Sequence, residues 1–248
     1  MNATVAMLTT RTVLGRRRTV LLLLLPLVLL ALCTFARVFA AMDDDVAAQL
    51  GQGLAADLLG GFGLAVLLPL LGLIAGTGAI GSEIDDGSIV YLLAKPLNRF
   101  SIVLTKLVVA FAVVTAFGAL PVVLGGLIMT GELGELSLGF GAGSLVAGLA
   151  YCALFLMLSV ITRNAVVIGL VYALVWESLV GQVVPGAQAL SIQQWGYAVT
   201  EGVVGDDALM LGIGSAVDLS TAAVLLVVVI VGCTWYATRR LRTIRLGE

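Results

Sequence analysis

Six long apolar segments, separated by shorter polar stretches, dominate the sequence between residues 20 and 238. A helix needs about 20 consecutive apolar residues to cross the hydrocarbon core of a bilayer, and each segment approaches or exceeds that length. Runs such as residues 20–32 do not alternate between polar and apolar positions, as strands of a membrane barrel do. Helices satisfy their own backbone hydrogen bonds in lipid. The pattern therefore predicts an all-α polytopic membrane protein with six transmembrane helices, at residues 20–39, 58–80, 102–129, 138–161, 165–184 and 219–238.

The charged residues separate by sign across these predicted spans. With six crossings, every basic residue except Arg37 falls on one side. The opposite side collects nine acidic residues: Asp43, Asp44, Asp45, Glu132, Glu135, Glu201, Asp206, Asp207 and Asp218. Because an excess of arginine and lysine marks the cytoplasmic side, both chain ends are predicted to be cytoplasmic. Arg37, near the outer end of the first span, can extend its side chain to the outer headgroups.

The composition supports the same class of protein. Of the 248 residues, 60% are hydrophobic and 11% are charged, whereas soluble globular domains have roughly 45–50% apolar and about 25% charged residues. Six crossings use most of the chain, which leaves one transmembrane domain, 1–248, and no separate soluble domain. The three cysteines are far apart and histidine is absent, so we expect no disulfide framework, no metal site and no catalytic residues.

Small residues recur in the predicted spans at a spacing that favours helix packing. Gly72 with Gly76, and Gly139 with Gly143, form Gly-x-x-x-Gly pairs, which let membrane helices approach closely. Prolines inside three spans are expected to kink them: Pro26, Pro69 and Pro121.

The segment before the first span, 1–18, mixes apolar residues with threonines and Arg11. This mixture fits an amphipathic helix on the cytoplasmic membrane surface. It also fits a frayed terminus without regular structure. The helix is the prediction taken forward.

The longest cytoplasmic connection, 81–101, has an ordered sequence of residue types. Acidic residues come first, an apolar stretch at 89–93 follows, and Lys95 and Arg99 close the segment. A short helix with acids at its N-terminus and a base at its C-terminus is favoured by the helix dipole. The apolar stretch is too short to cross a membrane, so it could bind the membrane surface or a groove in a partner protein.

In this loop the chain resembles the ABC-2 type transporter permeases. The corresponding loop of that family runs from a glutamate through Gly-Thr, an apolar stretch with paired leucines and a proline to an arginine, and a lysine follows seven residues later. This chain has the same register, with serine in place of the threonine. Trp176-Glu177, Pro185-Gly186 and Leu190-Ser191-Ile192 also look like one branch of the family. The coupling-loop residues assigned from the resemblance are Glu83, Asp86, Gly87, Ser88, Tyr91, Leu92, Leu93, Pro96, Arg99 and Lys106.

The resemblance implies an architecture and a set of partners. The architecture is the type V exporter-like one, with six spans and short re-entrant helices between the fifth and sixth, for which the extracytoplasmic segment 182–217 is the candidate. The loop would be a coupling helix seated on a separate ATPase subunit, present in two copies that bind ATP and Mg. A second permease copy or a homologue would complete the assembly in a bacterial cytoplasmic membrane. This chain has no Gly-rich phosphate loop ending in Lys-Ser/Thr, so we expect neither a cofactor in it nor enzymatic activity.

Glu177, beside Trp176, interrupts the predicted fifth span about 18 Å along its helix. A carboxylate inside a membrane is costly and is a candidate for function. Glu177 and Trp176 are therefore candidates for a translocation path, with Glu177 lining it, carrying a proton or bonding to a neighbouring helix. The other interpretation is that the span ends early and Glu177 lies at its outer mouth.

The leading functional hypothesis is the membrane subunit of an ATP-driven exporter of a hydrophobic or amphipathic substrate, surrounded by lipid and without nucleic acid partners. The alternative is a proton-coupled secondary transporter that uses Glu177. Such transporters usually contain inverted repeats, and no convincing repeat is present. An intramembrane enzyme is disfavoured because the histidines of zinc motifs and of Ser-His-Asp triads are missing. A scaffold without transport activity is a further possibility.

Overall fold

The structure is a computed structural model that describes residues 3–13, 16–42, 53–85, 98–180 and 186–243, and the described residues are helical apart from short turns and connections. The elements in chain order are α1 (Ala3–Val13), α2 (Arg16–Ala40), the π-helical η1 (Leu58–Leu67), α4 (Leu68–Asp85), α6 (Arg99–Val114), the π-helical η2 (Thr115–Ala119), α7 (Leu120–Thr130), α8 (Glu135–Ile161), α9 (Ala165–Val171), the π-helical η3 (Tyr172–Val180), the 3-10 turn η4 (Gln188–Leu190), α11 (Ile192–Val204), the 3-10 turn η5 (Gly205–Ala208) and α12 (Leu219–Thr243).

Five helical stretches in the described residues are long and apolar enough to cross a membrane. Each coincides with a predicted span, which confirms those five predictions. The stretches are Thr19–Ala40, Gly53–Gly81, Arg99–Thr130, Glu135–Ile161 and Leu219–Leu241.

The predicted fifth span differs from the other five. Its described part consists of α9 and η3 and ends at Val180, and its apolar helix, Ala165–Glu177, is shorter than a bilayer crossing requires. The described residues thus contain five candidate spans, and a sixth stays a prediction.

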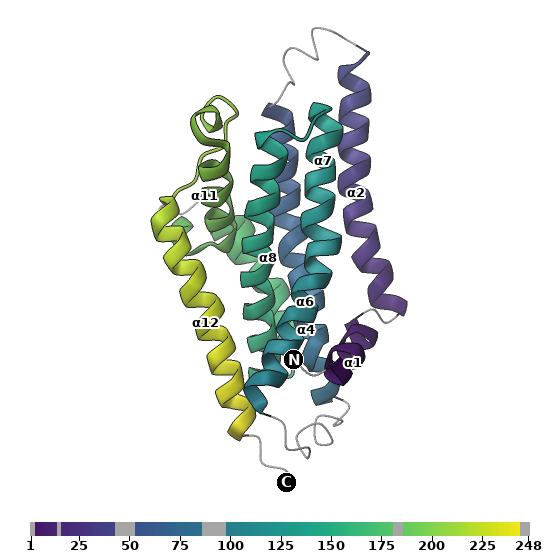
Figure 1. The fold of residues 1–248 in the computed structure, drawn as a ribbon, viewed down its shortest axis with the longest axis vertical. Coiled ribbons are helices and arrows are strands. Elements are labelled where there is room, and N and C mark those ends of the chain that lie inside the picture. Colours follow the sequence, from purple (N-terminus) through teal and green to yellow (C-terminus); the bar gives the residue numbers. More distant parts are fainter. Residues whose placement is uncertain (1–2, 14–15, 43–52, 86–97, 181–185, 244–248) are drawn as a thin grey trace.

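Helix α8 lies at the centre of the bundle and packs against α4, α11 and α12 (Figure 1). Helices α2 and α12 lie at opposite edges (Figure 1), and each buries only 22% of its most apolar window inside the protein. Their outer faces carry large apolar side chains such as Leu27 and Val228. Such faces are suited to contact with lipid tails.

The two glycine pairs lie where α8 packs closely against α4 and against α11. A methyl group added at Gly72 would lie 2.7 Å from Tyr151 Cβ, so α4 has no room for a larger residue there. Gly139 and Gly143 face α11 in the same way. The predicted packing role of these pairs is confirmed.

Two of the span prolines lie two residues after the end of a π-helical segment. Pro69 comes after η1 and Pro121 after η2. At each site the backbone N–H before the proline bonds five residues back, from Leu68 to Gly63 and from Leu120 to Thr115. The wider turn accommodates the proline ring and its missing donor, and it adjusts the course of both helices.

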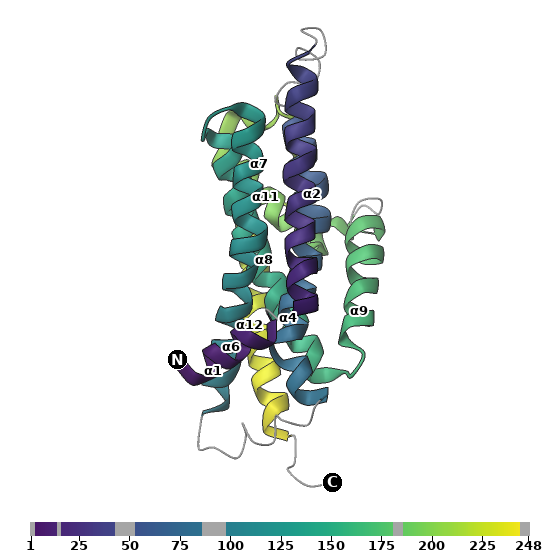
Figure 2. The ribbon, with the colours of Figure 1, turned by 90° about the vertical axis from the view of Figure 1, so that its right-hand side faces the viewer.

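The ends of the helices divide into two sets, one at each end of the bundle. Helix α1 lies across the bundle axis at the same end as the C-terminal turns of α12 (Figure 2).

Arg37, near the other end, does not depend on headgroups for a partner, because its Nη1 donates to the carbonyl oxygen of Met129 at 2.7 Å. That carbonyl belongs to the last turn of α7, which lacks helical donors. Arg37 therefore caps α7.

Candidate functional site

The base of the predicted coupling loop is held by a buried ion pair. Glu83 is near the end of α4, and Lys106 lies about two turns into α6. The Nζ atom of Lys106 lies 2.7 Å from Glu83 Oε1 and donates to the carbonyl oxygen of Ala79 at 2.5 Å. The Lys106 side chain is 0% exposed and that of Glu83 15%. The pair therefore fastens together the two helices from which the loop emerges.

Arg99 connects the far end of the loop to a third helix. It is the first residue of α6, and its Nη1 donates to the carbonyl oxygen of Leu241 in the last turn of α12. Carbonyls in a last turn lack helical donors, so the arginine satisfies one. Asn98 caps α6 by accepting the backbone N–H of Phe100 at 3.1 Å. The loop is thus bounded by contacts to both α4 and α12.

The structure brings together Glu83 and Lys106 among the predicted coupling residues, and it places Arg99 about two turns before Lys106 on α6. The other predicted coupling residues lie outside the described residues: Asp86, Gly87, Ser88, Tyr91, Leu92, Leu93 and Pro96.

Glu177 is completely buried and accepts four hydrogen bonds. Its Oε1 accepts from the Tyr172 hydroxyl at 2.8 Å and from the backbone N–H of Ile192 at 3.1 Å. Its Oε2 accepts from the Ser191 hydroxyl at 2.5 Å and from the backbone N–H of Gln193 at 3.4 Å. Glu177 thus joins η3 to the first turn of α11. Of the uses considered for it, bonding to a neighbouring helix is the one these contacts support.

Two residues whose hydroxyls bind Glu177, Tyr172 and Ser191, were not among the candidate site residues of the sequence interpretation. Tyr172 lies five positions before Glu177, a spacing that the π-helical turn brings to one face. Ser191 is also the N-cap of α11, accepting from the backbone N–H of Gln194 at 3.4 Å. A serine directly before an apolar helical run is a recognisable signal of a cap, and it could have identified Ser191.

Helix α11 runs antiparallel to α8 in close contact. Gly196 lies beside Ala147, whereas Val204 lies beside Gly139. Gly196 is therefore about 18 Å along α8 from its start, at 1.5 Å per residue. The first turn of α11, bound to Glu177, lies deeper still. Trp176, the other candidate path residue, is half-buried, and its role stays a prediction.

Glu177→Gln is expected to destabilise the protein by about 1–3 kcal/mol. The amide keeps one acceptor oxygen but places a donor group against one of the two backbone N–H groups of α11, which cannot rotate away. We expect a lower Tm in detergent and faster proteolysis within 186–217. Asp206→Asn, at an exposed position in η5, is the control. Wild-type stability together with lost transport would instead assign Glu177 to the translocation path.

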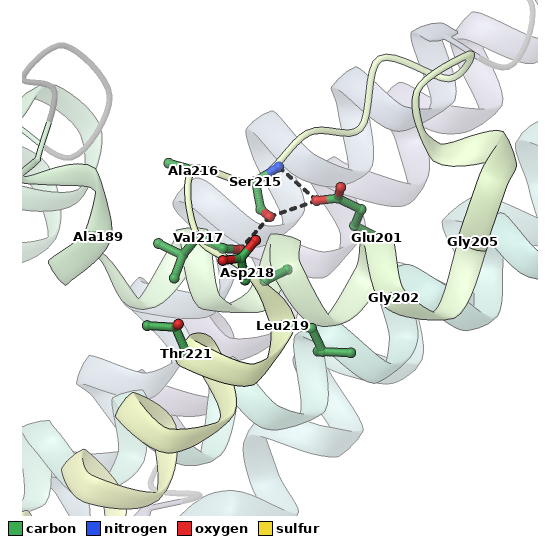
Figure 3. Close-up of a pocket in the computed structure, with 11 residues that line it drawn as sticks. Ala189, Glu201, Gly202, Gly205, Ser215, Ala216, Val217, Asp218, Leu219 and Thr221 are labelled. Atoms are coloured by element: carbon green, nitrogen blue, oxygen red, sulfur yellow. Dashed lines mark hydrogen bonds between the residues drawn. The ribbon is translucent and has the colours of Figure 1, made fainter.

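A pocket of about 520 Å³ opens beside the other end of α11 (Figure 3). Glu201 and Asp218 both line it, and Glu201 is directed towards Ser215 (Figure 3). Glu201 Oε2 accepts from the Ser215 backbone N–H at 3.0 Å and from its hydroxyl at 2.7 Å. Glu201 therefore fixes the chain that leads into α12.

Comparison with known proteins agrees with this arrangement. A family model described as ABC-2 family transporter protein matches residues 10–239, a range that holds four of the candidate spans in full, most of the fifth, the Glu83–Lys106 pair and Glu177. No curated protein matches the sequence. Membrane permease domains of this family typically have no ATPase activity and generally partner with an ABC ATPase. The match confirms the resemblance carried by the loop residues: the chain belongs to the ABC-2 family of transporter membrane proteins.

Proposed function

We propose that this chain is the membrane-spanning subunit of an ATP-binding cassette exporter in a bacterial cytoplasmic membrane. Two copies of a separate ATPase subunit, with ATP and Mg, supply the energy, and a second permease copy or a homologue completes the translocation path. The observation that carries the proposal is the buried Lys106–Glu83 pair at the base of the loop, together with the contact of Arg99 with α12.

These contacts give a route for movement from the loop to the spans. A force applied to 86–97 by a closing ATPase reaches α4 and α6 together, because Glu83 and Lys106 tie them. It reaches α12 through the hydrogen bond from Arg99 to Leu241. Rigid helices fastened in this way move as bodies, which is how domain closure is transmitted in switching proteins.

The proposed topology has six crossings, with both termini cytoplasmic. The fifth crossing in chain order, the one beyond the five candidate spans, consists of α9, η3 and the residues that follow them. We further propose that 182–217 is re-entrant, since α11 starts beside the buried Glu177 and runs along α8 towards the start of that helix. Two backbone N–H groups in the first turn of α11 then donate to Glu177 inside the membrane. Backbone donors in lipid need such partners within the protein.

The cargo proposed is hydrophobic or amphipathic. Among the described residues, the buried charged side chains are Lys106 and Glu177, and both already have partners within the protein. A strongly polar cargo would need further uncompensated groups along its path. The proton-coupled alternative uses Glu177, whose two oxygens are each occupied by a backbone donor and a hydroxyl donor.

Photocrosslinking tests the proposal directly. A crosslinking amino acid at Tyr91 or Leu92 is expected to capture an ATPase subunit encoded beside this chain, in membranes that contain both. The same group at Val227, on the exposed apolar face of α12, is expected to capture none. Capture at neither loop position, or ion-driven transport by the purified chain alone, would contradict the proposal.

A further inference from the structure

A groove lies at the basic end of the bundle, beside the N-cap of α6 described above. It has a volume of about 370 Å³ and is formed by the start of α6 and the last turns of α12. Its lining residues are Asn98, Phe100, Trp235, Thr238 and Arg239. Both helices belong to candidate membrane spans, which begin at Arg99 and end at Leu241. The groove therefore lies where two spans leave the hydrocarbon, whatever the orientation of the protein.

The walls of the groove are aromatic and exposed. Phe100 is 46% exposed and Trp235 is 58% exposed. Aromatic side chains are enriched at the boundary between hydrocarbon and headgroups. Each continues as an apolar track on its own helix, through Leu104 and Val108 on α6 and through Val231 and Val228 on α12. Positions three to four residues apart share one helix face, so both tracks lead from the groove into the bilayer.

The mouth of the groove is positively charged. The Arg239 guanidinium lies 5.4 Å from the centre of the Trp235 ring, and no carboxylate of the described residues pairs with it. The N-terminus of α6 adds the positive end of a helix dipole. The amide nitrogen of Asn98 is a further donor, because its oxygen accepts from the backbone N–H of Phe100.

We propose that this groove binds an anionic phospholipid. The headgroup phosphate lies between Arg239, the Asn98 amide and the first turn of α6, and an acyl chain follows the track below Trp235. A guanidinium with free donors and a helix N-terminus are both suited to a phosphate. The apolar tracks favour a lipid over a soluble anion, since they bury an acyl chain. The binding places a lipid against the same two helices that Arg99 joins.

Quenching of Trp235 by brominated lipids tests this site. The full-length protein is reconstituted in phosphatidylcholine with equal amounts of brominated phosphatidylglycerol or brominated phosphatidylcholine. The signal of Trp235→Phe is subtracted to remove Trp176 and Trp195. We expect stronger quenching by the anionic lipid. Arg239→Gln should lower this preference about five-fold, the factor expected of one basic side chain near an anionic surface, and Arg239→Lys should keep most of it.

Arg163→Gln is the matched control, because Arg163 is an exposed arginine in the turn between α8 and α9. It should leave the preference unchanged. Equal quenching by the two lipids would overturn the proposal, as would an equal effect of Arg163→Gln and Arg239→Gln. Loss of the preference in millimolar inorganic phosphate would identify a site for soluble anions and would also overturn it.

Discussion

Glu83→Gln is expected to destabilise the protein by about 3–5 kcal/mol, the range for removing one partner of a buried ion pair. Lys106 is 0% exposed, and within the described residues its Nζ contacts Glu83 Oε1 and the carbonyl oxygen of Ala79. Without the carboxylate, the ammonium group stays buried beside neutral acceptors alone, the glutamine amide oxygen and the carbonyl oxygen of Ala79. Thermal or denaturant unfolding in detergent measures the change.

The charge, and not the shape, of the pair is tested by adding Lys106→Met. Methionine preserves much of the lysine volume and removes the charge. The double variant Glu83→Gln/Lys106→Met is expected to recover most of the lost stability. A coupling energy near zero in the resulting cycle would contradict a paired interaction. Glu132→Gln, in the exposed turn between α7 and α8, should change stability by less than about 0.5 kcal/mol.

The same variants separate a role of the ion pair in stability from a role in transmitting movement from the loop to the spans. If the pair carries movement from the loop, the double variant should still bind the ATPase, but the complex should transport only slowly. Full transport by that variant would assign the pair to stability alone.

Gly143→Ala is expected to destabilise the protein by about 1–3 kcal/mol through overpacking. The added methyl group would lie 2.5 Å from the carbonyl oxygen of Gly196 and closer still to the Thr200 hydroxyl. Because the carbonyl oxygen of Gly196 belongs to the backbone, no side-chain rotation can relieve that contact, and α11 must move away from α8. That movement also strains the bonds between Glu177 and the first turn of α11.

The control for this substitution is Gly232→Ala on α12, where an added methyl group meets nothing within 4 Å. Alanine has the better helix propensity, so this variant should be as stable as the wild type or more so. We expect Gly143→Ala alone to lower Tm and to expose 186–217 to protease. Equal behaviour of the two variants would show that α8 and α11 are not closely packed.

The local structure of this protein could be predicted from the sequence because lipid leaves few alternatives. A long apolar run must form a helix to satisfy its backbone. The described parts of all six predicted runs are helical, and five of the helical stretches are long enough to cross a membrane. The glycine pairs likewise marked where helices approach. The remaining run contains Glu177, and its apolar length alone could not decide whether it crosses the membrane.

The partners of the polar residues were decided only by the tertiary structure. Local periodicity places Lys106, Arg99, Glu177 and Arg37 on helices, but their partners lie 23, 142, 14 and 92 residues away in the chain. Which carbonyl or carboxylate each one meets depends on how the helices pack around α8. The sequence by itself therefore determined the spans and the family resemblance, whereas tertiary packing made Glu177 the anchor of α11 and Arg37 the cap of α7.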